Sequence, residues 1–401
     1  MKTLATVRPA APHDEAKARL AGAVEAHRDE ILELSHRIHA NPEPAFEEHR
    51  ASAWVADVVA RHGFEVTRPA GSLATAVRAT RRGGLDRNGP RIGILAEYDA
   101  LPGLGHACGH NTMAASGVGA AIALATLADG LPGEIVFLGT PAEERGSGKQ
   151  FMIDDGLFDG LDAALQYHPC DRSHVECVAL AAEDVEVTFR GRPAHAAADP
   201  WEGLNALDAL VLLFQGIGLW RQQLRPEARV HGIVIEGGTA SNIIPERAVG
   251  RFMIRSFDRH YFEQMRSRFR DIAEGAAKSA GVEVDVVFSG GSRTMNHNRT
   301  IGARWVANAE AYGIADQGVD PTAGSTDMGN VSWHVPTIHP DLAIVAESTP
   351  AHTSAFREAA ASARADEVTL LAATLVAQTA YDLIAEPELV EAAWQEFRAA
   401  T

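Results

Sequence analysis

Residues 97–112, EYDALPGLGHACGHNT, constrain the fold of this chain more than any other stretch. They follow residues 91–96, a short apolar run that starts after Gly-Pro and predicts a buried strand. They lead into residues 112–128, a run of small and apolar residues without proline that predicts a tightly packed helix. In open α/β sheets, ligands bind beyond the carboxyl ends of strands, so we expect a binding site at this loop.

This loop is rich in side chains that can bind a metal ion or accept a proton. They are Glu97, Asp99, His106, Cys108 and His110. Cys108 and His110 are two residues apart in a glycine-containing segment, so both can turn toward one ion. Thiolate and imidazole are good Zn²⁺ ligands, and a nearby carboxylate commonly orients a ligating histidine. Taken alone, such a pair is more often a buried thiol beside a helix-capping histidine, so other parts of the chain must decide.

Two later predicted strands end in side chains of the same kind. Residues 134–139 lead into a proline- and glycine-framed loop with Glu143 and Glu144, and residues 162–167 lead into His168. Paired glutamates commonly mark a solvated helix face, and a single histidine at a strand end is commonly structural. Three successive strand ends with metal-competent groups are hard to explain separately. We therefore expect these groups to share one site.

The C-terminal part of the chain offers three histidines for a further ligand: His334, His339 and His352. His352 follows the short predicted strand 342–346 and is the best placed. Near the N-terminus, a second group of histidines and glutamates flanks a predicted helix end at residues 41–44. We interpret this group as a solvated helix terminus rather than a metal cluster; it comprises His36, His39, Glu47, Glu48 and His49.

From about residue 183 the sequence pattern changes to strands that alternate with period two. Strands are predicted at 184–189, 229–235, 248–257 and 281–288, with helices at 203–224 and 261–280. This order predicts a compact antiparallel α+β unit of ferredoxin-like type. We expect an α/β chain in which residues 1–182 and 295–401 form a catalytic domain with a central mixed sheet flanked by helices. Residues 183–294 form a smaller inserted domain.

Three other stretches complete the expected fold. Residues 14–40 have the apolar spacing and acidic start of one amphipathic helix. Residues 64–77 alternate like strand material, and residues 324–330, GSTDMGN, predict a polar, glycine-rich loop. Amphipathic helices are expected at 365–384 and 387–399, where they close the catalytic domain.

Composition narrows the function. The chain has 401 residues and a formal net charge of −17 at pH 7, which argues against nucleic-acid binding because that needs basic residues to neutralise phosphates. Uninterrupted apolar runs are shorter than the ~20 residues that cross a bilayer. The N-terminal sequence lacks the apolar core of a secretory signal. Three cysteines without Cys-x-x-Cys spacing predict no disulfide framework. We expect a cytoplasmic protein without nucleic-acid or membrane partners.

Eight sequence blocks together resemble the M20 family of metal-dependent peptidases and amidohydrolases, subfamily D. The group that contains aminoacylase-1-like-2 and p-aminobenzoyl-glutamate hydrolase is the most similar. The blocks are HANPEPAFEE, AEYDALPGLGHACGHN, GTPAEE, YHP, GRPAHAAADPWEGLNAL, TASNIIPERA, GSTDMGNVS and AHT. Two blocks depart from the pattern frequent in the subfamily: Glu97 stands in place of an aspartate, and Asn111 follows His110 where aspartate is common.

The resemblance implies a large zinc-peptidase-like catalytic domain and a set of site residues. Two divalent metal ions, Zn²⁺ or alternatively Mn²⁺ or Co²⁺, would be bound by Cys108, His110, Glu144, His168 and His352. Glu143 matches the general base and Asp99 the carboxylate that orients a ligand. In the inserted dimerisation or lid domain, His195 matches a histidine that reaches the partner subunit's site in a homodimer. Asn242 and Arg255 match substrate-contacting residues.

The implied reaction is hydrolysis of an amide bond in a small substrate with a free carboxylate. A metal-bridged water would be the nucleophile, with Glu143 taking its proton. Dipeptides and N-acyl or aroyl amino acids are both candidate substrates. Arg255, with Asn242, would hold the carboxylate; the alternative is an arginine that is solvated or paired with Glu246 or Asp258.

Two other functions compete with this one. A cysteine amidase would use Cys108 as nucleophile and His106 or His110 as base, but it leaves Glu143, Glu144, His168 and His352 without a role. A binding or regulatory homologue would have lost a ligand or the base, and this chain keeps all six. The fold alone cannot decide, because one fold hosts many chemistries.

Overall fold

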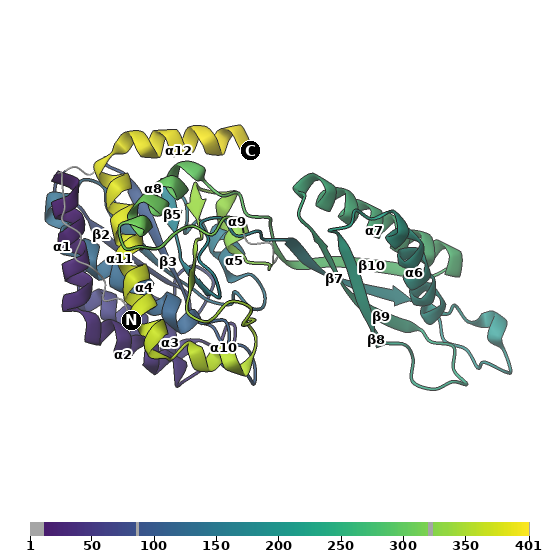
Figure 1. Ribbon diagram of the computed structural model, residues 1–401. Coiled ribbons are helices and arrows are strands. Elements are labelled where there is room, and N and C mark those ends of the chain that lie inside the picture. The colour runs from purple at the N-terminus through teal and green to yellow at the C-terminus, as the bar shows by residue number, and fades with distance from the viewer. Residues whose placement is uncertain (1–11, 86–87, 320–323, 401) are drawn as a thin grey trace. The chain divides into compact units, whose positions relative to one another are not determined.

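The computed structural model describes residues 12–85, 88–319 and 324–400. These residues form two compact units (Figure 1). Unit 1 comprises the chain up to Val178 and from Met295 onward, and unit 2 comprises Ala179–Thr294. Each unit has its own hydrophobic core.

Unit 1 is built on a mixed sheet with helices around it. Its strands are β1 (Glu65–Thr67), β2 (Val77–Arg82), β3 (Arg91–Glu97), β4 (Glu134–Thr140), β5 (Ala163–Leu165), β6 (His168–Cys170), β11 (Thr337–Ile338) and β12 (Asp341–Ala343). Six of them form one sheet in the order β1-β2-β4-β3-β5-β11. Strand β3 runs parallel to β4 and β5, whereas β2 runs antiparallel to β4. The predicted mixed α/β class is therefore confirmed.

Helices surround the sheet of unit 1, and at the contact between three of them the facing residues include small ones. The helices are α1 (Pro12–Ala26), α2 (Arg28–His39), α3 (His49–Arg61), α4 (His110–Ala125), α5 (Gly148–Asp154), α8 (Arg299–Glu310), α9 (Met328–Ser332), α10 (Ser354–Ala359), α11 (Ala363–Ala385) and α12 (Pro387–Ala400). A Cβ added to Gly119 in α4 would lie 3.0 Å from the Cβ of Ala373 in α11 and 2.9 Å from Cδ1 of Ile31. The run of small residues in α4 thus permits close three-helix packing, with α4 and α11 side by side (Figure 1).

Three expectations about local structure were wrong. The predicted helix 14–40 is two helices that break at His27, whose ψ of 15° leaves the helical region. Residues 64–77 form only the short strand β1 and a turn before β2. The segment 324–330 is not all loop, since α9 begins at Met328.

Helix α11 is long and apolar enough to cross a membrane by length and composition alone. However, 83% of its most apolar stretch is buried inside the protein. Such burial is typical of the core helix of a globular protein.

Unit 2 is a four-stranded antiparallel sheet with two helices. Its strands are β7 (Ala181–Arg190), β8 (Arg229–Glu236), β9 (Arg247–Ser256) and β10 (Glu283–Ser292), and its helices are α6 (Ala206–Trp220) and α7 (Arg259–Ala280). The sheet order is β10-β7-β9-β8, and the chain order is strand-helix-strand-strand-helix-strand as expected. The helices pack together on one face of the sheet (Figure 1). Asn205 and Asp258 cap them by accepting backbone hydrogen bonds.

Candidate metal centre

The carboxyl ends of three neighbouring parallel strands position the cluster in unit 1. Glu97, the last residue of β3, is paired in register with Thr140, the last residue of β4. The loop after β4 therefore begins beside Glu97 and carries Glu143 and Glu144. His168 follows β5 closely and begins β6. As expected, the sheet gathers these groups at one edge because its strands are parallel there.

Backbone conformation brings Cys108 and His110 into this edge. Gly109 has φ +81°, which glycine adopts without steric cost. A Cβ at this position would lie 2.6 Å from Cγ of Pro169, the residue after His168. A side chain at position 109 would therefore push the Cys108–His110 turn away from His168. Helix α4 begins directly at His110.

The five predicted ligands lie in two overlapping groups. Cys108, His110 and His168 form one group, and Cys108, Glu144 and His352 form the other; within each, the ligand atoms lie within 4.8 Å of one another. Cys108 Sγ is 3.6 Å from His168 Nε2, and His352 Nε2 is 3.4 Å from Glu144 Oε2. Because Cys108 belongs to both groups, two ions held by them would be neighbours.

Asp99 orients His110. The Nδ1 atom of His110 is 3.0 Å from both Oδ1 and the backbone oxygen of Asp99, so Nδ1 is the donor and Nε2 faces the cluster. The other Asp99 oxygen, Oδ2, accepts a hydrogen bond of 2.9 Å from the backbone N–H of Glu144. Asp99 therefore links two of the predicted ligands without standing in either group.

The buried charges of the cluster fit divalent cations. Glu97, Asp99 and Asp327 are fully or almost fully buried, and Lys149 is the buried cation beside them. Three buried side-chain atoms there make no hydrogen bond: Glu97 Oε2, His110 Nε2 and Glu144 Oε1. Charges and polar atoms in a protein interior cost free energy unless they are paired, hydrogen-bonded or bound to a metal. Thiolate, imidazole and carboxylate are together the donor set of a Zn²⁺ site.

The cluster also perturbs acid–base behaviour. Burial opposes the charged form of His110, but Cys108, Asp99 and Glu97 raise its pKa well above the usual range. Burial and the charges of Glu97 and Glu144 raise the pKa of Glu143. Burial lowers the pKa of His168 to about 4. Strong shifts of this kind are typical of functional sites.

The other candidate histidines lie in different surroundings. The ring of His339 is buried and lies 5.4 Å, centroid to centroid, from the ring of His168, outside the two ligand groups. His334 pairs with Asp159 at 3.1 Å. Of the three late histidines, His352 is thus the one grouped with predicted ligands.

Sequence reasoning missed the role of one N-terminal residue. We interpreted the group around the first helix end as solvated, but Glu48 is 0% exposed. Its Oε1 accepts hydrogen bonds of 2.9 Å from the backbone N–H groups of Phe46 and Ala142, and its Oε2 accepts one of 2.7 Å from Thr75 Oγ1. Ala142 has φ +60° and directly precedes Glu143. Glu48 therefore holds the loop that carries Glu143.

The predicted residues of unit 2 do not all come together. The loops of His195 and Asn242 pair with each other. The Ala196 N–H donates to Asn242 O at 3.0 Å, and the backbones of His195 and Ile243 form an antiparallel β-bridge. Arg255 lies at the other end of β9, opposite Ala182. The span from Arg247, beside the paired loops, to Arg255 is about 26 Å of extended strand.

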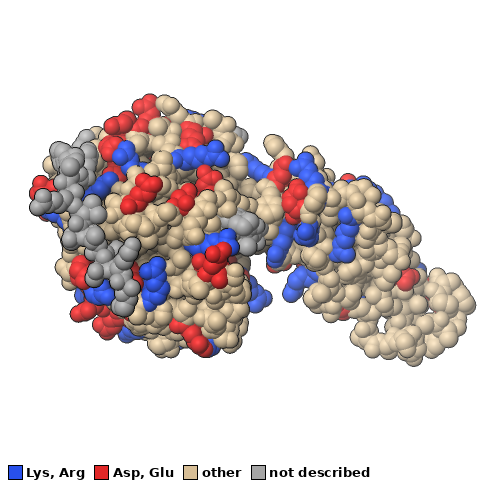
Figure 2. Space-filling view, viewed as in Figure 1, with Lys and Arg blue, Asp and Glu red and all other residues tan. Residues whose placement is uncertain are grey.

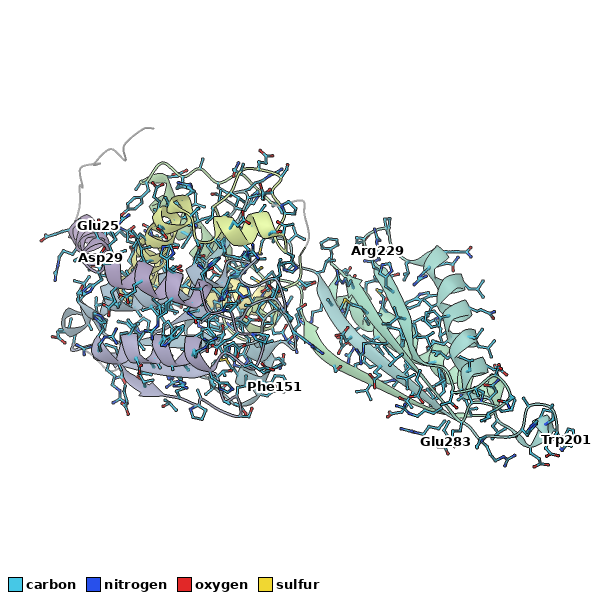
Figure 3. The ribbon with its side chains drawn as sticks, turned by 90° about the horizontal axis from the view of Figure 1, so that it is seen from below. Glu25, Asp29, Phe151, Trp201, Arg229 and Glu283 are labelled. Atoms are coloured by element: carbon cyan, nitrogen blue, oxygen red, sulfur yellow. The ribbon has the colours of Figure 1, made fainter. Side chains whose placement is uncertain are left out.

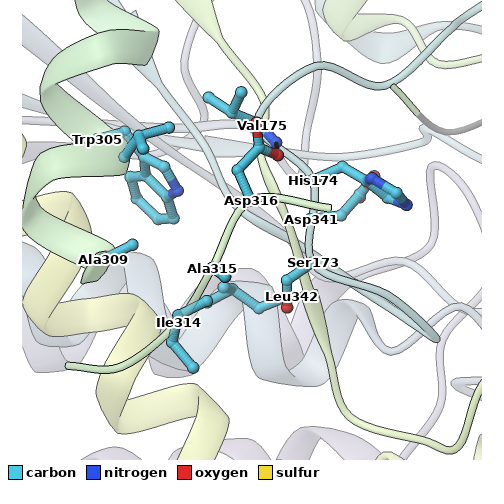
Figure 4. Close-up of a pocket in the computed structure, with 11 residues that line it drawn as sticks. Ser173, His174, Val175, Trp305, Ala309, Ile314, Ala315, Asp316, Asp341 and Leu342 are labelled. Atoms are coloured by element: carbon cyan, nitrogen blue, oxygen red, sulfur yellow. Dashed lines mark hydrogen bonds between the residues drawn. The ribbon is translucent and has the colours of Figure 1, made fainter. Parts of the chain in front are cut away.

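Unit 1 also has a small pocket, whose lining includes Asp341, a residue 3.7 Å from His168 Nδ1 of the cluster through its Oδ1 (Figure 4). Trp305 and Ala309 of α8 line it, together with Asp316 and Leu342. Its volume is about 10 Å³, enough for roughly one water molecule. His174 in its wall donates from Nδ1 to Gly318 O at 2.6 Å, which is a structural contact.

The sheet and the cluster at the carboxyl ends of its strands form an α/β unit with a candidate metal centre. Residues 93–374 match the family described as Peptidase family M20/M25/M40, and the chain belongs to this family. It is 36% identical to human Xaa-Arg dipeptidase over 408 residues, covering 95% of this chain and 92% of that protein. It is 29% identical to a subunit of Escherichia coli p-aminobenzoyl-glutamate hydrolase, covering 94% of each.

A solved structure has the same fold. A Bacillus subtilis protein described as a dinuclear metal-binding peptidase from the M20 family superposes with a TM-score of 0.68 at 21% identity. The match covers 90% of this chain and 99% of that one. The resemblance recognised from the sequence is confirmed, and the chain is a hydrolytic enzyme.

Proposed function

We propose that this enzyme hydrolyses an amide bond in a small substrate that carries a free carboxylate, using two divalent cations. The observation that carries the proposal is the sharing of Cys108 between two donor groups beside Glu143. Candidate substrates are dipeptides and N-acyl or aroyl amino acids. The names of the human and bacterial relatives support both classes.

The residues that would hold the cations are Cys108, His110, Glu144, His168 and His352. Their mixed donors suit Zn²⁺, with Mn²⁺ or Co²⁺ as alternatives. When bound, such cations would polarise the scissile carbonyl and lower the pKa of a water molecule to about 7.

Glu143 is the proposed general base. It shares no donor group with Cys108, Glu144, His168 or His352, although its carboxylate lies within 4.8 Å of donor atoms of Glu97 and His110. From this position its carboxylate would accept a proton from the attacking water. Burial and the charges of Glu97 and Glu144 raise the pKa of Glu143, and a carboxyl group with a raised pKa holds the proton that it would pass on to the leaving nitrogen. The hydrogen bonds of Glu48 hold the preceding residue and so orient Glu143.

The electrostatics of Cys108 disfavour the cysteine-amidase alternative. Burial and the charge of Glu144 raise the pKa of the Cys108 thiol. A nucleophilic cysteine needs the opposite shift, because the thiolate is the reactive form. A cation among the same donors favours the thiolate as a ligand.

The geometry of unit 2 supports a homodimer in which each subunit supplies residues to the site of the other. Arg247, beside the loops of His195 and Asn242, is about 26 Å of extended strand from Arg255, so we propose that one small substrate does not reach both ends of the sheet of one chain. His195 Nδ1 accepts from the N–H groups of Ala197 and Ala198, which leaves Nε2–H as a free donor for an oxyanion. Trp201, 72% exposed, lies at the tip of unit 2 on the loop after His195 (Figure 3).

An exposed apolar face of unit 2 suits the dimer contact. Strand β8 is an edge strand, and such edges are usually covered or blunted. Ile233 of β8 is 60% exposed and Leu219 of α6 is 67% exposed. Other exposed apolar residues of these two elements are Val211, Leu212, Val234 and Ile235.

Arg255 is the proposed holder of the substrate carboxylate. Its guanidinium donates to Met253 Sδ at 2.9 and 3.0 Å. Asp258, one acid considered for it, instead pairs with Arg225 at 2.6 Å. A thioether is a weak acceptor, so the guanidinium can exchange this contact for a charge-assisted bond to a carboxylate.

We also propose a cytoplasmic location without nucleic-acid or membrane partners, on the grounds of composition. On the face shown in Figure 2, acidic and basic residues are interspersed rather than gathered into a basic stripe. Binding to nucleic acid needs such a stripe.

A substrate panel tests the proposal. Zinc- and manganese-loaded enzyme would be assayed with dipeptides, including those ending in arginine, with N-acyl amino acids and with aminobenzoyl-glutamate. Each substrate would be paired with its carboxamide. We expect hydrolysis of at least one acid and poor hydrolysis of its carboxamide. No hydrolysis in the panel, or equal rates for acid and amide, would contradict the proposal.

A further inference from the structure

Glu97, the last residue of β3, has two oxygens in different situations. Its Oε1 accepts a hydrogen bond of 2.5 Å from Lys149 Nζ. Its Oε2 makes no hydrogen bond, although it lies 3.2 Å from His110 Nε2. The side chain is buried, so water cannot solvate the free oxygen. A buried carboxylate oxygen of this kind calls for a partner.

Lys149 and Asp327 fix the direction of Glu97. Lys149 Nζ lies 2.5 Å from Asp327 Oδ1 as well as from Glu97, and the Lys149 backbone N–H donates to Asp327 Oδ2 at 2.9 Å. All three side chains are buried. One ammonium between two carboxylates leaves the trio with a net negative charge. Asp327 alone can balance the charge of Lys149, so the lysine does not account for the second buried carboxylate, Glu97.

The free oxygen of Glu97 points at a proposed ligand atom. His110 Nδ1 is engaged by Asp99, so Nε2 is the atom with which His110 would bind a cation. Glu97, His110 and Glu143 form a third group whose donor atoms lie within 4.8 Å of one another. Any cation on His110 Nε2 therefore has the free Glu97 oxygen close by.

We propose that Glu97 is a further metal ligand, which binds through Oε2 the cation held by His110. Lys149 and Asp327 act as positioning residues that hold its other oxygen. This inference rests on the proposed function, since it assigns one more donor to the same centre. It also gives the excess negative charge of the trio a counter-ion.

Metal binding by variants tests the inference without relying on activity. Chelator competition would give the affinity for each of two Zn²⁺ ions in the wild type, in Glu97→Gln and in Asp382→Asn. Asp382 is the matched control, because it is a buried acid paired with Lys17 at 2.8 Å and belongs to no donor group. We expect Glu97→Gln to weaken one ion about 10- to 100-fold or more, and the control to bind both as the wild type does.

A crystal structure of the zinc-loaded wild type tests the same inference without a variant, and so does not depend on whether Glu97→Gln folds. An anomalous zinc peak about 2.0–2.2 Å from Glu97 Oε2 would support the inference. A peak on His110 with Glu97 Oε2 beyond about 3 Å would overturn it, as would wild-type affinity for both ions in Glu97→Gln. A wild type that binds no ion would overturn the proposed function as well.

Discussion

The candidate residues of units 1 and 2 differ in how they are held. In unit 1 the donors are packed into one buried cluster, and Asp99 and Glu48 fix the loops that carry them. In unit 2 the candidates lie at opposite ends of a sheet, and the His195 loop is exposed. Unit 1 can therefore assemble its centre within one chain. As we propose, the candidates of unit 2 would meet around one substrate only with the help of a second chain.

Glu143→Gln should give the largest effect, because it removes the proposed base from unit 1. We expect turnover to fall about 10²-fold or more while both cations remain bound. Steady-state kinetics beside metal analysis would measure this. Near-normal turnover would contradict the role of Glu143, and loss of a cation would make it a ligand instead.

Mixing two inactive variants tests whether unit 2 works in the partner's site. A heterodimer of His195→Ala and Glu143→Gln should regain one functional site, because one site has both residues intact. The measurement is activity after subunit exchange has been verified, for example by mass spectrometry of differently tagged chains. Continued inactivity of verified heterodimers would show that His195 does not act across the dimer.

Arg255→Ala should reduce kcat/KM for the acid substrate about 10- to 150-fold, from the loss of a charge-assisted hydrogen bond. Arg251→Ala is the matched control, since Arg251 lies on the same strand but pairs with Glu186 at 3.1 Å. The wild type should discriminate acid from carboxamide, and Arg255→Ala should discriminate little. If Arg255→Ala keeps the full discrimination, the carboxylate is held elsewhere.

A further prediction concerns the stability of unit 1 rather than its activity. Burial and the charge of Asp99 raise the pKa of Glu48 from 4.5 to about 7. Because the folded pKa is the higher one, the unfolded state loses its proton first as the pH rises. Stability should therefore fall between pH 4.5 and about 7, by about 3 kcal/mol from this group.

Glu48→Gln keeps one amide oxygen that can accept from both backbone N–H groups, but it cannot ionise. Denaturant unfolding at several pH values should show that its stability relative to the wild type rises across this window. Parallel pH profiles for the two proteins would contradict the assignment.

Much of the unit 1 centre was predictable because its donors follow strands whose carboxyl ends meet. The apolar runs before Glu97, Glu143 and His168 indicated those strands, and the order of strands and helices in unit 2 was equally legible. Apolar runs marked the strands of unit 1, and period-two alternation marked the strands of unit 2.

The features that the sequence did not reveal depend on contacts between residues far apart in the chain. The burial of Glu48 arises from Thr75 and Ala142, and Lys149 meets Asp327 across the fold. The separation of Asn242 from Arg255 follows from the length and register of β9 rather than from their spacing in the sequence. The break at His27 carries no proline or glycine, so no local signal marks it.

Stepwise metal reconstitution tests the central claim most directly. The enzyme would be stripped with chelator and then titrated with Zn²⁺, while bound metal and amide hydrolysis are measured on the same samples. We predict that hydrolysis is lost on stripping and returns as up to two ions per chain are bound, with alkylation of Cys108 suppressed in parallel. Full hydrolysis by protein without metal would contradict the account.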